Sequence, residues 1–535
     1  MNRINIKKPK IRWLFGGIGF QNSEATMLRI MSDKVKNEIA LKTFMELSPT
    51  FSRVFIGYAD WSKEAMDAFA DYYDITFRNS GTLLYAVPGR MPMFDETFDM
   101  EEYSEKVASN FEYLIKERKC TKIRYYCVTN ELSVGNSISW LAKRLDTFKK
   151  LHEHLYKAFK KHGLNIGLLA TDCAGASNFG QIQWAADNMD EVTECYCAHL
   201  YSGNYKPGDI DAYDYFKEVF SGPVRVAQTK EKRFILGEFG IFEWEEPGKW
   251  PMRKDGTYSE QYPEEENIHA IALCELAVAA INTGCLAGVM WTMIDYPDPF
   301  LKEDGDTPEE KARFDVARYS GHGIDFRYNK HGLIRWSDDE EDYTSRASLY
   351  TMGYMAKLFR KGSRVLEISD MDDKYIRCAA VTNPDKSVSV VIINWEDKAK
   401  EVEIDMEHTS DKPFRKYEYS ADSVPYNKFN DLQSFSEVVE GKKVKLLPRS
   451  VTFLTTDYVD RKPSKIKNIL VSDGILSWDE CKDSEHCYYR VFASDKKRFT
   501  PCYENQIAST VSTSLEINSE NLYYKVLSVD KFGNV

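Results

Sequence analysis

Two alternating patterns of hydrophobic and polar positions run through the first 360 residues. Short apolar runs, rich in β-branched and aromatic residues and ending in polar or Gly-containing turns, are typical of buried parallel strands. Eight such runs occur, at residues 13–20, 51–57, 82–88, 123–129, 166–171, 195–200, 234–239 and 286–293. Amphipathic helical stretches lie between them, for example at 66–73, 102–116, 139–161 and 267–283, and a last one follows at 344–360. This alternation predicts an α/β fold, a closed (β/α)8 TIM barrel over residues 1–360.

The pattern changes after residue 360. Short β-patterned runs separated by Asp, Asn, Gly, Lys and Pro turns predict an antiparallel β-sandwich over residues 361–460. A third unit, residues 461–535, has five more short runs around Trp478 and predicts a small immunoglobulin-like sandwich. The Lys462-Pro463 junction predicts a boundary that few contacts cross. The first sandwich follows the barrel with hardly any linker, so we expect it to pack against the barrel.

The composition is that of an ordinary globular protein. Of 535 residues, 43% are hydrophobic and 29% charged, and no apolar stretch reaches the roughly 20 residues needed to span a bilayer. The formal net charge of −12 disfavours nucleic acid and anionic membrane as partners and favours a neutral ligand. No apolar segment typical of a signal peptide follows the basic start, which predicts a cytoplasmic protein. A secreted protein whose leader has been removed is the alternative.

The 11 cysteines are scattered and form no tight framework. Cys195 and Cys197 are two apart in a predicted strand, so they share a face, and no second Cys or His pair stands nearby to complete a zinc site. We therefore expect two thiols that line the barrel. Cys481 and Cys487 are close enough in sequence for a disulfide. No metal and no organic cofactor is expected.

Two of the predicted strands end in a glutamate. Glu131 follows the run 123–129, and Glu238 lies at the end of the run 234–239. In a β/α barrel the C-terminal ends of the strands form the face that carries the chemistry. Two carboxyl groups facing each other there are the minimum equipment for hydrolysing a glycosidic bond. The sequence thus predicts a carboxylate pair at the barrel mouth.

In strand order, these and other residues resemble the retaining glycoside hydrolases of clan A, a superfamily of (β/α)8 barrels. In that superfamily Asn-Glu follows the fourth strand and a second glutamate ends the seventh, as Asn130-Glu131 and Glu238 do here. The further matching elements are Arg53 in the second strand, His199-Leu-Tyr201 in the sixth and Trp291 in the eighth. Residues 361–460 resemble the β-sandwich that follows the barrel in several of these families, and residues 463–535 resemble a fibronectin type III module.

The resemblance implies that Glu238 is the nucleophile and Glu131 the acid/base of a double displacement. Such a mechanism needs one carboxyl ionised and the other protonated, about 5 Å apart. Neighbouring groups must therefore push the two pKa values in opposite directions. Arg53 would hold Glu238 charged and aligned, and Tyr201 would donate a hydrogen bond to the same carboxylate.

The remaining residues of the resemblance are expected to bind substrate. Asn130 is suited to hydrogen-bond the sugar 2-hydroxyl next to the reacting carbon. His199 shares a strand face with Tyr201, so both can point into the barrel mouth. Trp291 would offer a flat apolar surface to the sugar ring.

We therefore expect a retaining glycosidase that acts on β-type bonds of a neutral oligosaccharide or glycoside. A transglycosylase would use the same two glutamates, and a catalytically idle carbohydrate-binding barrel would have lost one of them. A metal-dependent barrel hydrolase would need His-x-His in the first strand, which reads Trp-Leu-Phe-Gly-Gly-Ile-Gly-Phe, and the chain has only 9 histidines. The sequence leaves the sugar, the linkage and the oligomeric state open.

Overall fold

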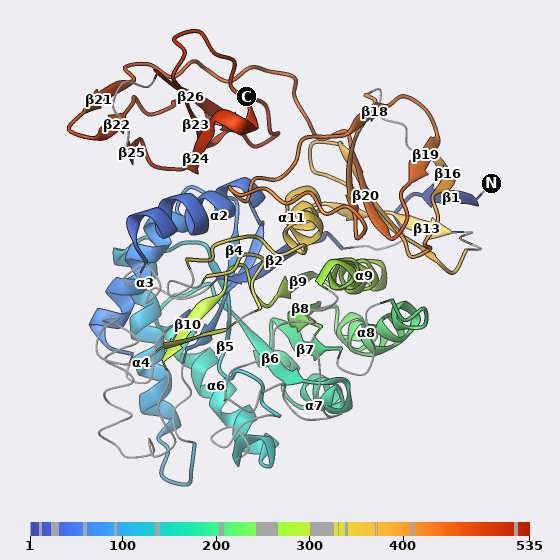
Figure 1. Cartoon of the computed structure of the whole chain (residues 1–535). Helices are drawn as coiled ribbons and strands as arrows, with labels where there is room; N and C mark the ends of the chain where they lie inside the picture. Colours follow the sequence, from blue (N-terminus) through green and yellow to red (C-terminus); the bar gives the residue numbers. More distant parts are fainter. Residues whose placement is uncertain are drawn as a thin grey trace.

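The computed structural model describes residues 2–9, 13–22, 31–56, 61–89, 94–133, 140–202, 208–241, 266–299, 326–329, 331–336, 341–369, 371, 373–407, 412–517 and 523–535. Eight parallel strands close into a barrel in which each strand pairs with the next and the last pairs with the first (Figure 1). They are β2 (Gly17–Asn22), β3 (Phe51–Ile56), β4 (Leu83–Pro88), β5 (Ile123–Cys127), β6 (Gly167–Ala174), β7 (Cys195–Tyr201), β8 (Phe234–Gly240) and β9 (Ala287–Met290). The predicted (β/α)8 barrel is confirmed, and the run ending at Glu131 is its fourth strand.

Helices cover the outside of the barrel (Figure 1). Ser62 and Asp99 cap two of them by accepting hydrogen bonds from backbone N–H groups of the first turn. The α-helices are α2 (Leu41–Leu47), α3 (Lys63–Thr76), α4 (Met100–Glu112), α6 (Leu145–Lys161), α7 (Gly180–Asn188), α8 (Ala212–Thr229), α9 (Glu266–Thr283) and α11 (Leu349–Leu358). Short helical turns are η1 (Val35–Ala40), η2 (Tyr113–Glu117), η3 (Ala176–Asn178), η4 (Asp190–Val192) and η6 (Tyr503–Asn505). Within the described ranges, none of the helices is long and apolar enough to cross a membrane.

The predicted sandwich after the barrel is confirmed as two sheets. One sheet has the order β12 (Arg364–Val365), β14 (Ile376–Thr382), β15 (Val388–Asn394), β20 (Ser450–Thr455), β17 (Phe414–Ser420) and β18 (Glu437–Val439). The other has the order β13 (Glu367–Ser369), β1 (Asn2–Lys7), β16 (Lys400–Met406) and β19 (Lys443–Leu446). Helix α9 contacts β14, β15 and β20, so this apolar helix is buried between the barrel and the sandwich.

The first strand of the chain lies in the sandwich, although the sequence placed residues 1–9 with the barrel. Strand β1 pairs in parallel with β16 and antiparallel with β13. Only two of its residues are apolar, Ile4 and Ile6, and both are buried in the sandwich core. Two alternating apolar residues are too short a pattern to predict a strand or its partner. This pairing ties the start of the chain to the sandwich.

The third unit has two three-stranded antiparallel sheets. They are β21 (Leu470–Ser472), β22 (Ile475–Ser477) and β25 (Ser514–Glu516), and β24 (Gln506–Thr510), β23 (His486–Ser494) and β26 (Tyr523–Asp530). Trp478 packs between them with Leu476, Tyr489 and Val491, as the sequence predicted for this tryptophan. A small sandwich is thus confirmed, and the fibronectin type III resemblance stays a prediction. Outside these units, β10 (Tyr296–Pro299) pairs with β11 (Phe326–Asn329).

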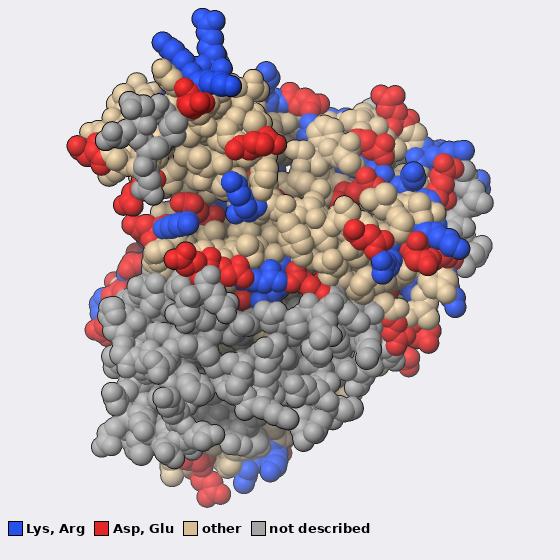
Figure 2. Space-filling view, in the orientation of Figure 1, with Lys and Arg blue, Asp and Glu red and all other residues tan. Residues whose placement is uncertain are grey.

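On the face drawn in Figure 2, acidic and basic side chains are interspersed over the sandwich and the third unit. Several basic side chains gather at the top of the third unit in this view, and both signs of charge lie side by side over the rest of the described surface.

A buried charge network joins the third unit to the other two. Lys42 of α2 is fully buried, with its Nζ 2.7 Å from Asp431 Oδ1 and 2.8 Å from Glu46 Oε2. From strand β23, Arg490 Nε lies 3.0 Å from Asp431 Oδ2, and the Tyr488 hydroxyl donates to Glu46 Oε1 at 2.9 Å. The expectation that few contacts cross this boundary is therefore wrong. It failed because Lys42 and Glu46 find Asp431 and Tyr488 as partners, which lie hundreds of positions away in the sequence.

Replacing Lys42 with alanine should weaken the whole assembly. Removing one partner of a buried ion pair leaves the other charges without compensation, and we expect a loss of about 3 kcal/mol in the free energy of unfolding. Lys63→Ala, which removes the exposed Lys63–Asp67 pair, should leave stability nearly unchanged. Urea unfolding followed by tryptophan fluorescence compares the two variants. An equally small effect of both would mean that the network does not hold the units together.

Candidate active site

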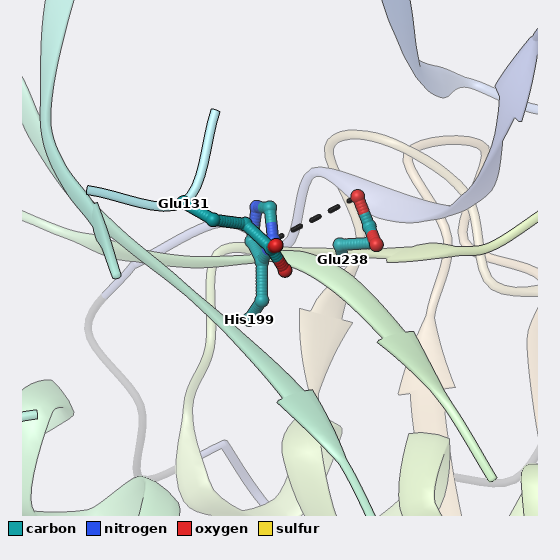
Figure 3. Close-up of side chains that lie close together, drawn as sticks. All are labelled: Glu131, His199 and Glu238. Carbon is teal, nitrogen blue, oxygen red and sulfur yellow. Dashed lines mark hydrogen bonds and ion pairs between the residues drawn. The ribbon is translucent and has the colours of Figure 1, made fainter. Parts of the chain in front are cut away.

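The two predicted glutamates meet at the barrel mouth. Glu131 follows β5, the fourth barrel strand, and Glu238 lies in β8, the seventh. His199 lies in β7, and the three side chains point toward one another (Figure 3). One carboxylate oxygen of each glutamate and one ring nitrogen of His199 lie within 4.8 Å of one another. This separation agrees with the roughly 5 Å between the carboxyl groups of a retaining arrangement.

Glu238 is buried and both of its oxygens accept hydrogen bonds. Arg53 Nη1 donates to Oε2 at 2.8 Å, and the Tyr201 hydroxyl donates to Oε1. Burial raises the pKa of Glu238 and the charge of nearby Glu131 adds to this, whereas His199, Arg53 and the Tyr201 hydrogen bond oppose it. The two donors hold the carboxylate in one orientation.

Arg53 is the hub of the cluster and is fully buried. Its guanidinium also donates to Gln21 Oε1 at 3.0 Å and to Asn130 Oδ1, and it lies 3.7 Å from Asp172 Oδ2. Burial opposes its charge, but Glu238 and Asp172 outweigh that effect and raise its pKa. Arg53 therefore stays charged and connects four strands of the barrel.

His199 lies between two carboxylates. Its Nδ1 is 3.1 Å from Glu131 Oε1, and its Nε2 is 3.0 Å from Asp172 Oδ1. Burial alone would lower the pKa of His199, but Asp172 and then Glu238 outweigh it and raise the pKa to about 10. Each ring nitrogen lies at hydrogen-bonding distance from a carboxylate oxygen, an arrangement that favours the doubly protonated imidazolium.

Asp172 is the member of the cluster that the sequence analysis missed. It is fully buried in β6, where Oδ1 accepts hydrogen bonds from the Tyr85 hydroxyl and, at 3.0 Å, from Cys197 Sγ. Burial alone would raise its pKa, but the charges of His199 and Arg53 hold the pKa well below the usual range. The signal was present, since Asp172 directly follows the predicted strand 166–171. The same rule that selected Glu131 would have selected it.

The backbone is left-handed at two of these carboxylates. Glu131 has φ 58° and Asp172 has φ 57°. Side chains other than glycine rarely adopt this region, and holding a residue there costs on the order of 1–3 kcal/mol. Such residues persist where the surrounding structure over-determines them, and they cluster at functional sites. Glu131 lies beyond the end of β5, and Asp172 lies within β6 at a register shift in its pairing with β7.

Asn130 and Trp291 lie at the edge of the cluster. The Asn130 amide oxygen accepts from Arg53, so its NH2 group is the part suited to donate to a sugar hydroxyl. Trp291 directly follows β9, and its ring centroid lies 5.9 Å from that of Phe55 in an edge-on contact. The Phe55 ring in turn lies under the Arg53 guanidinium, 5.0 Å away. The Phe55 ring thus lies between Trp291 and the charged cluster.

The cluster Glu131, His199 and Glu238 also has the spacing of a metal site. A metal ligand must be a neutral imidazole, whereas the carboxylates on both sides hold His199 protonated. The guanidinium of Arg53 is paired with Glu238, one of the three residues of this cluster, and would repel a metal cation. The donor set therefore suits proton chemistry better than metal binding.

The thiols agree with the sequence analysis in the barrel. Cys195 and Cys197 are buried in the apolar interior enclosed by the strands, as predicted. All 11 cysteines are free, so the possible Cys481–Cys487 disulfide is not formed.

No protein-family model matches this sequence, and no curated protein sequence is significantly similar to it. Solved structures nevertheless share its fold. A bacterial orthologue of human α-L-iduronidase superposes with a TM-score of 0.59 at 11% identity, over 100% of this chain and 98% of that one. A glycoside hydrolase family 30 subfamily 8 xylanase from Clostridium acetobutylicum gives 0.56 at 14% identity, over 85% and 99%. The GH51 arabinofuranosidase from Xanthomonas axonopodis pv. citri gives 0.56 at 11% identity, over 85% and 100%.

These similarities confirm the predicted fold, a (β/α)8 barrel followed by β-sandwiches. The iduronidase orthologue covers the whole chain, so the likeness includes both C-terminal units. The chain has the (β/α)8 barrel and appended β-sandwiches that these structures share.

His199 should make stability depend on pH. Its folded pKa of about 10 exceeds the ordinary 6.5, so its contribution is full below pH 6.5 and is lost as pH rises through 10. The stability difference between wild type and His199→Gln should therefore shrink by on the order of 3 kcal/mol between pH 6 and pH 10. Denaturant titrations at both pH values measure it.

His152 is the matched control, because it is equally buried in the barrel but burial lowers its pKa to about 4. The difference between wild type and His152→Gln should change in the opposite direction over the same pH range, growing by less than about 1 kcal/mol, because the folded pKa of His152 lies below 6.5. A difference for His199→Gln that does not shrink would mean that His199 is neutral in the folded protein.

Proposed function

We propose that the chain is a retaining glycosidase that hydrolyses β-type O-glycosidic bonds of a neutral oligosaccharide or glycoside. The observation that carries this proposal is the carboxylate pair, with Glu131 and Glu238 oxygens within 4.8 Å at the mouth of the barrel. Its support is the unequal treatment of the two groups, because Arg53 and Tyr201 both donate to Glu238. A retaining mechanism needs this inequality.

The charges of the cluster support a single shared proton. Two cations, Arg53 and His199, face three carboxylates, Asp172, Glu131 and Glu238, so one protonated carboxyl makes the cluster neutral. The pKa of Asp172 is held low, which leaves the proton to the glutamate pair. Burial raises the pKa of Glu238, but Arg53 and Tyr201 donate to its two oxygens and favour its ionised form. On these two hydrogen bonds, and on the role that the resemblance gives each glutamate, we assign the proton to Glu131.

The reaction would then run in two steps. Glu238 attacks the anomeric carbon while the Glu131 proton passes to the leaving oxygen, which forms a covalent glycosyl-enzyme. Glu131, now ionised, takes a proton from water, and that water attacks the anomeric carbon and releases Glu238. Asn130 would donate to the 2-hydroxyl of the bound sugar, and Trp291 would form part of the wall of the site.

The two C-terminal units are proposed to brace the barrel and to stay outside the chemistry. In this division the barrel is residues 1–360, the sandwich 361–460 and the third unit 461–535, with strand β1 contributed to the sandwich. All seven residues selected for the site lie in the barrel. The substrate would therefore meet the barrel mouth.

A cytoplasmic location is proposed on the free thiols of all 11 cysteines, since disulfides are typical of secreted proteins. Secretion is the alternative: a 12% identical structure with a TM-score of 0.55 is a conserved exported protein from Bacteroides fragilis.

A transglycosylase is the second candidate, because the same glutamates would serve and only the acceptor differs. A panel of aryl glycosides, assayed with and without added acceptor sugar, separates the two activities. Free sugar as the main product supports the hydrolase, and a new glycoside as the main product supports the transglycosylase. A catalytically idle barrel would release no aglycone from any member of the panel.

Alanine substitution of the two glutamates should affect turnover differently. Glu238→Ala should abolish turnover of every glycoside, since no covalent intermediate can form. Glu131→Ala should lose most activity on natural leaving groups, by about 10²–10⁴-fold, yet keep much of it on an activated aryl glycoside that needs little protonation. Added azide should accelerate Glu131→Ala, because it attacks the intermediate without a base.

The measurement is the rate of aryl glycoside cleavage with and without azide, together with identification of the glycosyl azide. The assigned roles would be contradicted if both variants lost activity equally and azide accelerated neither of them. Gln183→Ala, an exposed substitution on α7, is the control and should leave the rates unchanged.

A further inference from the structure

We propose that Asp172 is a positioning residue that holds His199 as an imidazolium against Glu131, so that the two glutamates share one proton. This inference rests on the proposed function for its catalytic consequence, but its physical content concerns the charge state of one histidine. Asp172 lies on the side of His199 opposite Glu131, and it would touch no substrate.

Asp172 lies between the two buried cations of the cluster, His199 and Arg53. Its Oδ1 is 3.0 Å from His199 Nε2, and its Oδ2 lies 3.7 Å from Arg53 Nη2. The side chain is fully buried, so an ionised carboxylate there needs cations beside it. The same requirement acts in reverse, because a buried imidazolium needs a carboxylate beside it. Asp172 and His199 therefore stabilise each other's charged forms.

The second ring nitrogen transmits this charge state to the glutamates. With Nε2–H committed to Asp172, Nδ1–H points at Glu131 Oε1 over 3.1 Å and lies 3.7 Å from Glu238 Oε2. A neutral His199 with its proton on Nε2 would instead present a lone pair to Glu131. That lone pair would draw the Glu131 proton toward the ring and away from the leaving oxygen. Asp172 would thereby act on catalysis through His199.

Charged and titratable groups from several strands surround His199. Beyond Asp172, the Cys197 thiol and the Tyr85 hydroxyl both donate to Asp172 Oδ1. Among the described residues, the groups around His199 are Arg53, Tyr85, Glu131, Asp172, Cys197, Tyr201 and Glu238. Two of these are glutamates whose own proton moves during the reaction. Asp172 is the carboxylate that stays ionised throughout, because its pKa is held low.

The test is Asp172→Asn, which keeps the size and a hydrogen-bonding group but removes the charge. In full-length protein labelled with ¹⁵N-histidine, the His199 ring signals are assigned by their loss in His199→Gln. We expect wild-type His199 to stay doubly protonated to about pH 9. In Asp172→Asn its titration midpoint should fall by at least about one unit, a tenfold weaker affinity for the proton.

Glu275→Gln is the matched control. Glu275 is also a buried carboxylate paired with an arginine, Arg377 Nε at 3.1 Å, but it lies on α9 against the sandwich. It should lower thermal stability as Asp172→Asn does and leave the His199 titration unchanged. An unchanged His199 titration in folded Asp172→Asn would overturn the proposal. An equal shift of the His199 titration midpoint in Glu275→Gln would also overturn it.

Activity supplies a second readout that a merely structural role would not move. On a glycoside with an unactivated leaving group, Asp172→Asn and His199→Gln should each reduce kcat/KM by at least about tenfold, and the double variant should be no slower than the worse single one. Additive losses would show that Asp172 does not act through His199. If wild type cleaves no glycoside, the proposed function fails while the NMR titration still decides the role of Asp172.

Discussion

Charge balance inside the barrel mouth is the constraint on which the site depends. Five ionisable side chains lie together there, namely Arg53, Asp172, His199, Glu131 and Glu238. An uncompensated charge at such depth costs several kcal/mol, so each cation must have a carboxylate and each carboxylate a donor. Two cations against three carboxylates leave room for one proton. That proton is the one an acid/base mechanism needs, and the cluster therefore suits both stability and chemistry.

The closed barrel makes this balance possible because each charged group comes from a different strand. Arg53 stands on β3, Asp172 on β6, His199 on β7 and Glu238 on β8, while Glu131 follows β5. The strands are hydrogen-bonded all the way around, so these side chains cannot separate without breaking the sheet. Left-handed backbone at Glu131 and Asp172 is held in place by the same closure.

Buried ion pairs also join the units to one another. Glu275 on α9 accepts from Arg377 Nε and, at 2.9 Å, from Trp395 Nε1 of the sandwich, and burial raises its pKa to about 7. Lys42 links α2 to Asp431 in the same way. Such contacts are directional, so they fix the C-terminal units in one orientation against the barrel. The third unit is thus part of one assembly with the barrel and the first sandwich.

Much of this could be predicted from the sequence, because barrel strands are local patterns and strand-end residues can be counted. That counting predicted the order of the strands and the pair Glu131 and Glu238, whereas the resemblance to clan A glycoside hydrolases supplied Arg53, His199 and Tyr201. Asp172 directly follows the predicted strand 166–171 and was missed because the resemblance names no residue at the end of that strand, which in the structure continues to Ala174. Strand β1 and the partners of Lys42 could not be predicted, because their pairings span hundreds of residues and Lys42 looks like part of a solvated helix face.

The proposed double displacement rests on the spacing of Glu131 and Glu238. Early-time proton NMR of the products, on any glycoside that the protein cleaves, tests it most directly. Two successive displacements at one carbon restore its configuration, so the first sugar released should have the same anomeric configuration as the substrate. Release of the opposite anomer first would contradict the account, even if both glutamates proved essential.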